Sequence, residues 1–127
     1  MDPDVERLSA GKYILVTTFR KDGTAVPTPL WVVVDGDGLA VWTPAQSYKV
    51  KRIRNDPRVR LAPCTARGTA TGEEVPGTAT VLEGEEAERI RRLIAKRYGV
   101  VGWLTIKGSQ LRRGRDGTVG IALSLGG

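Results

Sequence analysis

The sequence predicts a mainly β fold, a six-stranded antiparallel barrel, closed or split, with helices inserted between strands. Three observations favour this class. Six short runs are rich in β-branched and aromatic residues and are bounded by Gly, Pro and Asp, as strands typically are. The connections between the first three runs are too short for parallel pairing. Segments with helical periodicity separate the third run from the fourth and the fifth from the sixth, which is compatible with a barrel.

The first part of the chain predicts one short helix followed by an antiparallel meander. Asp2 and Pro3 are a helix cap and a first-turn residue, and the spacing of Val5 and Leu8 predicts a helix over residues 3–10. The turns RKDG and DGDG then connect three β-branched runs. The strands expected here are residues 12–19, 26–35 and 39–43.

The middle of the chain predicts a short helix that crosses between strands. Val50 and Ile53 lie at helical spacing in SYKVKRIRND. Asp56 and Pro57 end this helix, because the residue before a proline avoids helical backbone angles. The strands expected after it are residues 58–64 and 74–84.

Residues 85–98 form the clearest predicted helix. Acidic residues open it and basic residues close it, which suits the helix dipole, and Gly99 ends it. Its apolar side is formed by Ala87, Ile90, Leu93, Ile94 and Tyr98. Residues 100–110 are ambiguous between strand and helix, and we expect a helix. A charged turn, RRGRDG, then precedes a sixth strand over residues 118–125.

Composition limits the function classes. A chain of 127 residues with 40% hydrophobic and 27% charged residues fits a single domain spanning residues 1–127. We find neither a signal-peptide pattern nor an apolar run long enough for a membrane span, so a cytoplasmic location without membrane contact is expected. Cys64 is the single cysteine and histidine is absent, which argues against a metal site and against the common nucleophile pairs. We therefore expect no catalytic side chain, and chemistry supplied by a cofactor.

The basic stretch SYKVKRIRNDPRVRL, residues 47–61, is the main candidate for a ligand site. Four cationic residues lie between Lys49 and Arg54, directly after the loop over residues 43–47 that joins a strand to a helix. A helix start offers free N–H groups and a positive dipole end, so hydroxyls and a lysine placed there favour a phosphate. A run of charges is more often a solvated helix face, and only its position argues otherwise. The net charge of +6 likewise favours an anionic partner.

The VPTP segment is the second candidate. Pro27 and Pro29 lie one residue apart and remove two N–H donors from the same strand edge. With Thr28 between them, this edge leaves a slot where a planar ring could lie close to Trp31. Alternatively, the prolines protect an edge strand from aggregation.

Two of the predicted strands, around LWVVV and YILV, are apolar on both faces. A barrel has one interior, so the second apolar face needs a cover of helices or a partner subunit. We predict a homodimer. Trp42 and Trp103 are expected in the core or at an interface, and Cys64 as a buried thiol without a chemical role.

Two segments, KYILVTTFRKDGTAVPTPLWVVVDGDGLAVWT and SYKVKRIRNDPRVRLAPC, resemble the pyridoxamine-phosphate-oxidase-like proteins, specifically their short deazaflavin-dependent branch. The resemblance covers nearly the whole chain. Its most specific parts are the strand-turn-strand TTFRKDGT and the S-x-K-x-K-x-I-x-x-x-P block. It implies a dimeric FMN-binding split barrel of the flavin-reductase-like class, which holds coenzyme F420 or FMN between subunits and transfers a hydride.

The resemblance also implies the residues that bind the cofactor. Lys49 is expected to contact the cofactor phosphate, with Thr43 and Ser47 beside it and Lys51 and Arg52 as further cations. The ring is expected along the first two strands. The ring-side residues would be Thr17, Thr28, Pro29, Leu30 and Trp31. We expect F420 rather than FMN, because the deazaflavin adds a polyglutamate tail that further cations can pair with.

The predicted function is therefore an F420-dependent oxidoreductase acting on a small organic substrate. The alternatives are an FMN-dependent oxidoreductase, or a protein that binds a flavin, a deazaflavin or haem without turnover. A basic barrel could also bind single-stranded nucleic acid, but this requires aromatic residues interleaved with cations. Tyr48 alone lies within the basic stretch, so no nucleic-acid partner is expected.

Overall fold

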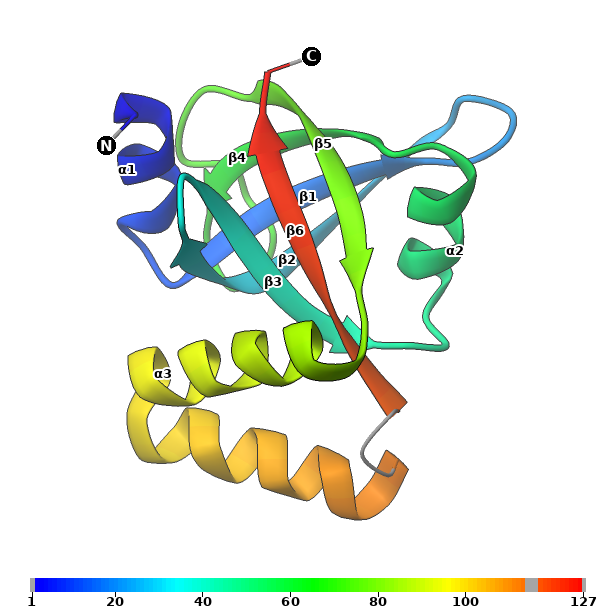
Figure 1. The fold of residues 1–127 in the computed structure, drawn as a ribbon. Coiled ribbons are helices and arrows are strands. Elements are labelled where there is room, and N and C mark those ends of the chain that lie inside the picture. Colours follow the sequence, from blue (N-terminus) through cyan, green and yellow to red (C-terminus); the bar gives the residue numbers. More distant parts are fainter. Residues whose placement is uncertain (1, 114–116, 127) are drawn as a thin grey trace.

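The computed structural model describes residues 2–113 and 117–126, within which six antiparallel strands close into a barrel (Figure 1). Their order is β1-β2-β3-β6-β5-β4, and β4 pairs with β1. The strands are β1 (Tyr13–Phe19), β2 (Ala25–Asp35), β3 (Gly38–Pro44), β4 (Arg58–Cys64), β5 (Val75–Leu82) and β6 (Thr118–Leu125). The predicted six-stranded antiparallel barrel is confirmed, and every predicted strand agrees with the observed one to within two residues at either end.

Only part of β2 pairs with β3. Residues 25–31 of β2 pair with β1, whereas only residues 32–35 pair with β3. Within the described part of the chain, the second edge of residues 25–31 is therefore unpaired. This confirms the open edge expected from Pro27 and Pro29, which offer no backbone N–H to a neighbouring strand.

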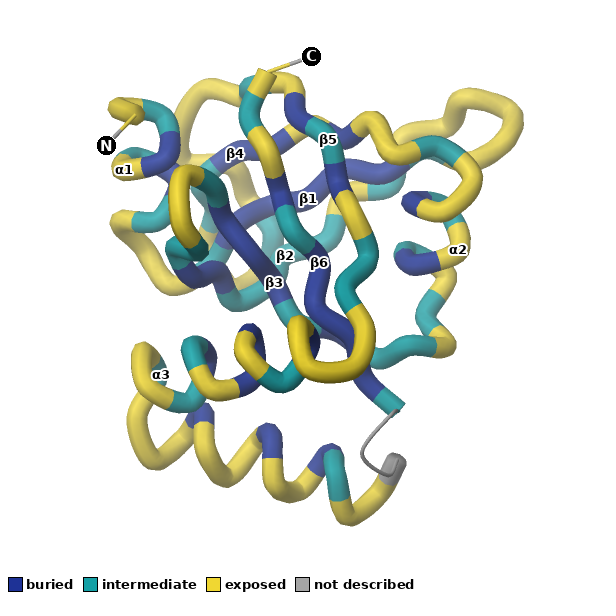
Figure 2. Tube along the Cα trace, in the orientation of Figure 1, coloured by how far each residue is buried: buried dark blue, intermediate teal, exposed yellow. Residues whose placement is uncertain are grey.

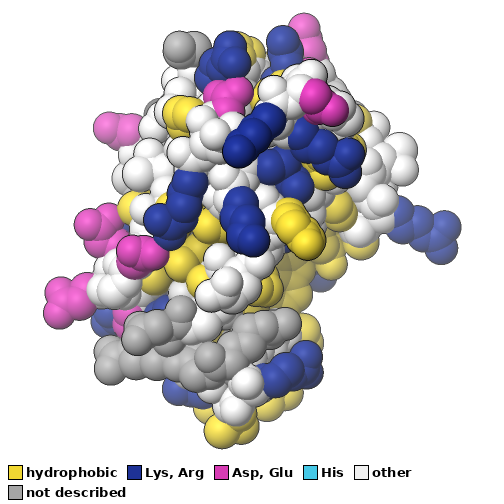
Figure 3. Space-filling view, turned by 90° about the vertical axis from the view of Figure 1, so that its right-hand side faces the viewer, with side chains coloured by type: hydrophobic (Ala, Val, Ile, Leu, Met, Phe, Trp, Pro, Cys, Tyr) yellow, Lys and Arg dark blue, Asp and Glu magenta, His cyan; other side chains and the backbone are white. Residues whose placement is uncertain are grey.

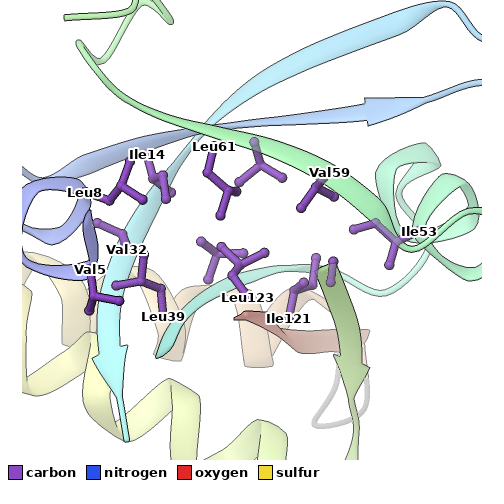
Figure 4. Close-up of a cluster of buried hydrophobic side chains, with 13 residues drawn as sticks. Val5, Leu8, Ile14, Val32, Leu39, Ile53, Val59, Leu61, Ile121 and Leu123 are labelled. Carbon is purple, nitrogen blue, oxygen red and sulfur yellow. The ribbon is translucent and has the colours of Figure 1, made fainter. Parts of the chain in front are cut away.

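Aliphatic side chains from all six strands fill the barrel interior (Figure 4). Two short helices close its ends, α1 (Pro3–Ser9) with Val5 and Leu8, and α2 (Tyr48–Asn55) with Ile53. All three side chains are at most 2% exposed. Burying one such side chain contributes roughly 1.5–3 kcal/mol, so the same core that holds the strands together also holds both helices.

The third helix, α3 (Gly84–Arg113), covers the outer face of the barrel (Figures 1 and 2). Ile90 and Ile94 of its first part pack against Val33 and Ala40. At Gly99 the backbone leaves the helical region, with φ 65° and ψ −143°, and the chain reverses direction. The structure thus confirms the helix predicted over residues 85–98 and its end at the glycine.

A second helical part, residues 100–113, packs back against the first. At Gly102 a side chain would place its Cβ 2.8 Å from Cβ of Tyr98 and 3.0 Å from the carbonyl oxygen of Ile94. Only glycine therefore allows the two parts to lie this close. The helix expected over residues 100–110 is confirmed, while most of the charged turn expected over residues 112–117 lies outside the described residues.

The outer apolar face of β2 and β3 is covered by α3 of the same chain, including a half-buried Trp42. The exposed apolar side chains instead lie on the second part of α3. They are Val100, Val101, Trp103, Leu104 and Leu111. Trp103 is 52% exposed and therefore not a core residue. Among the described helices, none is both long and apolar enough to cross a membrane.

Candidate anion and cofactor site

Helix α2 points two cations toward the end of the barrel. Its apolar residues Val50 and Ile53 are buried, which turns the neighbouring Lys49 and Arg52 toward the strand ends. Nζ of Lys49 donates to Oγ1 of Thr43 at 3.1 Å. Thr43 is the next-to-last residue of β3 and is 1% exposed. The loop after it leads into α2, which is the strand-loop-helix order that the sequence predicts.

Arg52 makes the equivalent contact with β1. Its Nε donates to Oγ1 of Thr18 at 2.7 Å. Thr18 is 1% exposed, and it shares the inward face of β1 with Ile14 and Val16 because side chains alternate along a strand. The side chains of Lys49 and Arg52 therefore each reach a buried hydroxyl at the same end of the barrel.

Neither Lys49 nor Arg52 forms an ion pair within the part of the chain that the structure describes. Burial lowers the pKa of Lys49, and the charge of Arg52 lowers it further. Burial also lowers the pKa of Arg52, with a smaller contribution from the charge of Arg20. Arg52 therefore repels Lys49, Arg20 repels Arg52, and an anion bound beside Arg52 would relieve this repulsion.

Ser47 adds a hydrogen-bonding group to this end of the barrel. It precedes α2 in an extended conformation, yet its side chain does not cap the helix. Its Oγ is buried and has no hydrogen-bond partner among the described residues. A buried hydroxyl without a partner costs free energy, and a phosphate oxygen beside Lys49 would satisfy it. The residues present therefore fit the anionic end of a cofactor.

The remaining cations of the basic stretch do not join this cluster. Lys51 is exposed and lies over the ring of Tyr48, with 5.4 Å from Nζ to the ring centroid. Arg54 pairs with Glu83 at 2.8 Å. The face that carries α2 shows Lys and Arg gathered around it (Figure 3). For Lys51, the contacts match a solvated helix face rather than a position at the site.

The residues expected beside the ring fall on two faces of the sheet. Trp31 packs with the cluster under α3, whereas Leu30 packs with the barrel interior. By alternation, Pro29 lies on the outer face with Trp31, and Thr28 on the inner face with Leu30. Thr17 pairs with Pro27 in register and belongs to the outer face. The five residues share the β1–β2 pair, but they do not converge on one surface.

Trp31 is held by α3. Its ring stacks on that of Tyr98, with 4.6 Å between centroids and 9° between planes. The Tyr98 hydroxyl accepts the N–H of Val32 at 3.0 Å and lies 2.7 Å from the carbonyl oxygens of Lys12 and Val32. The stacking on Tyr98 and the hydrogen bonds of Tyr98 therefore fix the orientation of Trp31 beside the unpaired edge of β2.

Three residues of this site were not predicted. Thr18, which accepts a hydrogen bond from Arg52, is one of them, because no local pattern indicates a contact across 34 residues. The sequence places Arg20 in a turn, whereas in the structure its charge lowers the pKa of Arg52. Tyr98 was predicted only as part of the apolar side of a helix, since no local pattern indicates a contact across 66 residues.

The chain matches the family model described as pyridoxamine 5'-phosphate oxidase over residues 3–120. No curated protein matches it significantly in sequence.

Several solved structures share the fold. A heme storage protein from Vibrio cholerae superposes with a TM-score of 0.70 and 13% identity, covering 99% of this chain and 90% of that one. A protein described as an F420 reductase gives a TM-score of 0.65 and 17% identity, covering 100% and 97%. A structure described as a domain-swapped dimer gives 0.64 and 21%, covering 87% and 79%. At these identities the similarity establishes the fold alone.

Proposed function

The chain belongs to the pyridoxamine 5'-phosphate oxidase family, and from this membership we propose that it is an F420-dependent oxidoreductase. The reaction would transfer a hydride between the deazaflavin and a small organic substrate. The observation that carries this proposal is the pair Lys49 and Arg52, two partly buried cations that meet hydroxyls and, within the described residues, no carboxylate.

In this proposal the two cations and Ser47 hold the cofactor phosphate. A phosphate oxygen can accept from the ammonium, the guanidinium and the serine hydroxyl together, and charge-assisted hydrogen bonds are roughly twice as strong as neutral ones. Thr43 orients Lys49 and Thr18 orients Arg52, each by accepting a hydrogen bond from the cation. Lys51 contributes a more distant positive charge from the exposed face of α2.

The ring would lie along the unpaired edge of β2. Thr28 and Pro29 form that edge, and Trp31, fixed by Tyr98, bounds it. Thr17 and Leu30 belong to the same strand pair and shape the two faces beside it. The bound deazaflavin supplies the hydride chemistry. The protein binds the phosphate, orients the ring and excludes water, and no acid or base from the chain is required.

We prefer F420 over FMN as the cofactor because a further cation lies beyond the position proposed for the phosphate. Arg20 lies close enough to lower the pKa of Arg52, and FMN offers no further negative group for it to pair with. The F420 reductase of the same fold is consistent with this choice.

A binding protein without turnover is the second candidate, because the heme storage protein from Vibrio cholerae has the same fold. Haem iron in proteins is held by His, Cys, Met or Tyr side chains, and the chain contains no histidine. The cations Lys49 and Arg52, which contact hydroxyls, favour a phosphorylated cofactor over haem.

The test is a fluorescence titration of the purified protein with F420 and FMN side by side. We expect saturable binding of F420 at micromolar concentration and weaker binding of FMN. Starting from reduced F420, the recovery of F420 absorbance on addition of quinone-like and conjugated acceptors then measures hydride transfer. Absence of saturable F420 binding would rule out the proposal, and tight binding without transfer to any acceptor would favour the storage function.

We also propose that two copies of the chain associate through the second part of α3. Its exposed Val100, Leu104 and Leu111 form an apolar surface that a partner would cover, and the similarly folded domain-swapped dimer supports self-association. Sedimentation of the wild type is expected to give a dimer, and the Leu104→Glu, Leu111→Glu double variant a monomer. A wild-type monomer at micromolar concentration would contradict this.

A further inference from the structure

A pocket lies between the end of β3 and the second part of α3, on the outer face of the barrel. It has a volume of about 360 Å³, and small-molecule sites usually measure about 300–1,000 Å³. We call it the α3 pocket. Its lining is mainly apolar and consists of Trp42, Pro44, Leu104, Thr105, Gly108, Ser109 and Arg112.

The α3 pocket and the candidate anion site lie on opposite faces of β3. Thr43, which accepts a hydrogen bond from Lys49, follows Val41 on the inner face of the strand. Side chains alternate along a strand, so Trp42 and Pro44 belong to the outer face, where Trp42 packs under α3. The pocket therefore shares no residue with the site proposed for the cofactor, and the inference drawn from it does not rest on the proposed function.

The indole N–H of Trp42 lacks an acceptor. Its Nε1 is buried and has no hydrogen-bond partner among the described residues. An unpaired buried donor costs free energy, so a donor of this kind in the wall of a pocket indicates an acceptor supplied by a ligand. Nε1 is shielded from solvent, and an acceptor reaches it when neighbouring side chains move. Arg112 lines the same pocket, is exposed and can change its rotamer.

The other lining residues limit the chemistry of the ligand. Arg112 forms no ion pair in the described part of the chain, and a guanidinium pairs well with a carboxylate. Pro44 and Leu104 offer apolar contacts, and Leu104 also belongs to the surface proposed for self-association. At Gly108 a Cβ would meet nothing within 4 Å, which leaves space along this wall.

We propose that the α3 pocket binds a small carboxylic acid with an apolar body. The carboxylate accepts from Nε1 of Trp42 and pairs with the guanidinium of Arg112. The apolar body lies against Pro44 and Leu104, beside the space at Gly108.

The first experiment locates a probe by the indole N–H signals of the ¹⁵N-labelled protein. The chain has three tryptophans, and spectra of the Trp31→Phe, Trp42→Phe and Trp103→Phe variants assign the three signals. The probe is naphthoate. Naphthylmethanol is the comparison, because it keeps the rings and an oxygen acceptor but carries no negative charge. We expect naphthoate to shift the Trp42 signal saturably below about 1 mM, and naphthylmethanol to bind about 3- to 10-fold more weakly.

Calorimetric titration with naphthoate then measures the contribution of each group. Trp42→Phe keeps a ring but removes the N–H, and we expect about 10-fold weaker binding. Arg112→Gln is expected to weaken naphthoate binding about 3- to 10-fold and to leave naphthylmethanol binding unchanged. Gly108→Leu puts a side chain into the pocket and is expected to abolish binding. The control is Lys107→Gln, which removes a charge from the same part of α3 outside the pocket and should bind like the wild type.

Three results would overturn the proposal. The first is a Trp42 signal that does not move in the wild type, including the case in which only the signal of Trp31 or Trp103 moves. The second is a Gly108→Leu variant that is folded and binds naphthoate as tightly as the wild type. The third is an equal loss in Arg112→Gln and Lys107→Gln, which would mean general attraction of an anion. Thermal unfolding verifies that each variant is folded, and no F420 is present, so failure of the proposed function leaves these results unaffected.

Discussion

Nζ of Lys49 lies 3.1 Å from Oγ1 of Thr43, so a partly buried ammonium is held at the end of β3 by a neutral hydroxyl. A hydroxyl orients a cation but does not neutralise it. The nearest charge known to act on Lys49 is that of Arg52, which is also positive. This arrangement is unfavourable for the protein alone and favourable once an anion is bound, as expected of a binding site rather than of a stabilising contact.

Replacing Lys49 with alanine is expected to weaken F420 binding by about 10- to 100-fold, because a charge-assisted hydrogen bond to the phosphate is lost. The matched control is Lys51→Ala, two residues away on the exposed face, for which we expect less than about a threefold change. Fluorescence titration measures both. Equal losses in the two variants would show that α2 attracts the cofactor through general charge only.

Binding is expected to weaken at alkaline pH. Burial and Arg52 lower the pKa of Lys49, and the anion pairs with the ammonium rather than the amine. Affinity should therefore be complete below this lowered pKa and fall as pH rises through it, with proton uptake on binding in that range. Calorimetric titration with F420 from neutral pH upward checks this.

The Lys49→Arg variant separates this effect from titration of the ligand, because guanidinium stays charged throughout the range. Its affinity should decline less with pH than that of the wild type. Identical pH profiles for the two proteins would mean that Lys49 does not set the dependence.

Replacing Tyr98 with phenylalanine is expected to lower the free energy of unfolding by about 1–2 kcal/mol. The variant keeps the ring on Trp31 but leaves the contacts to Val32 and Lys12 unmade. Urea denaturation measures the change. Tyr48→Phe is the control, since Tyr48 is 75% exposed and should lose almost nothing. A Tyr98 variant as stable as the wild type would show that these hydrogen bonds contribute no net stability.

Gly120→Ala is expected to be destabilising, by about 1–3 kcal/mol, because its Cβ would lie 2.9 Å from Cγ1 of Ile90 and push α3 away from β6. Gly108→Ala is the matched comparison. Nothing lies within 4 Å of its Cβ, and alanine is favoured over glycine in a helix by about 1 kcal/mol. Thermal unfolding should therefore move in opposite directions for the two variants. A shift in the same direction would show that the contact with Ile90 is readily relieved.

Local sequence patterns were sufficient to predict structural features that depend on residues close together in the chain. The spacing of Val50 and Ile53 and the stop at Pro57 predicted α2, and Lys49 follows Thr43 by six positions. The contact of Thr18 with Arg52 could not be predicted this way, because it joins β1 to α2 across 34 residues. The contact of Trp31 with Tyr98 depends on how α3 packs on the sheet, which the helical pattern alone does not specify.

The role of Gly102 illustrates the same limit. Glycine disfavours helices, so Gly102 by itself argues against a helix over residues 100–110. In the structure it permits the two parts of α3 to pack closely, so its small size serves a tertiary contact. The sequence alone does not reveal this benefit, because it depends on which part of the chain packs against Gly102.

In helix α2, residues that pack in the core alternate with residues that face the candidate site. Val50 and Ile53 keep the barrel closed, while Lys49 and Arg52 face the candidate site. Substitutions at the two charged positions can therefore change ligand preference without altering the side chains that fill the core. A descendant of this chain could exchange one anionic cofactor for another in single mutational steps and remain folded at each step.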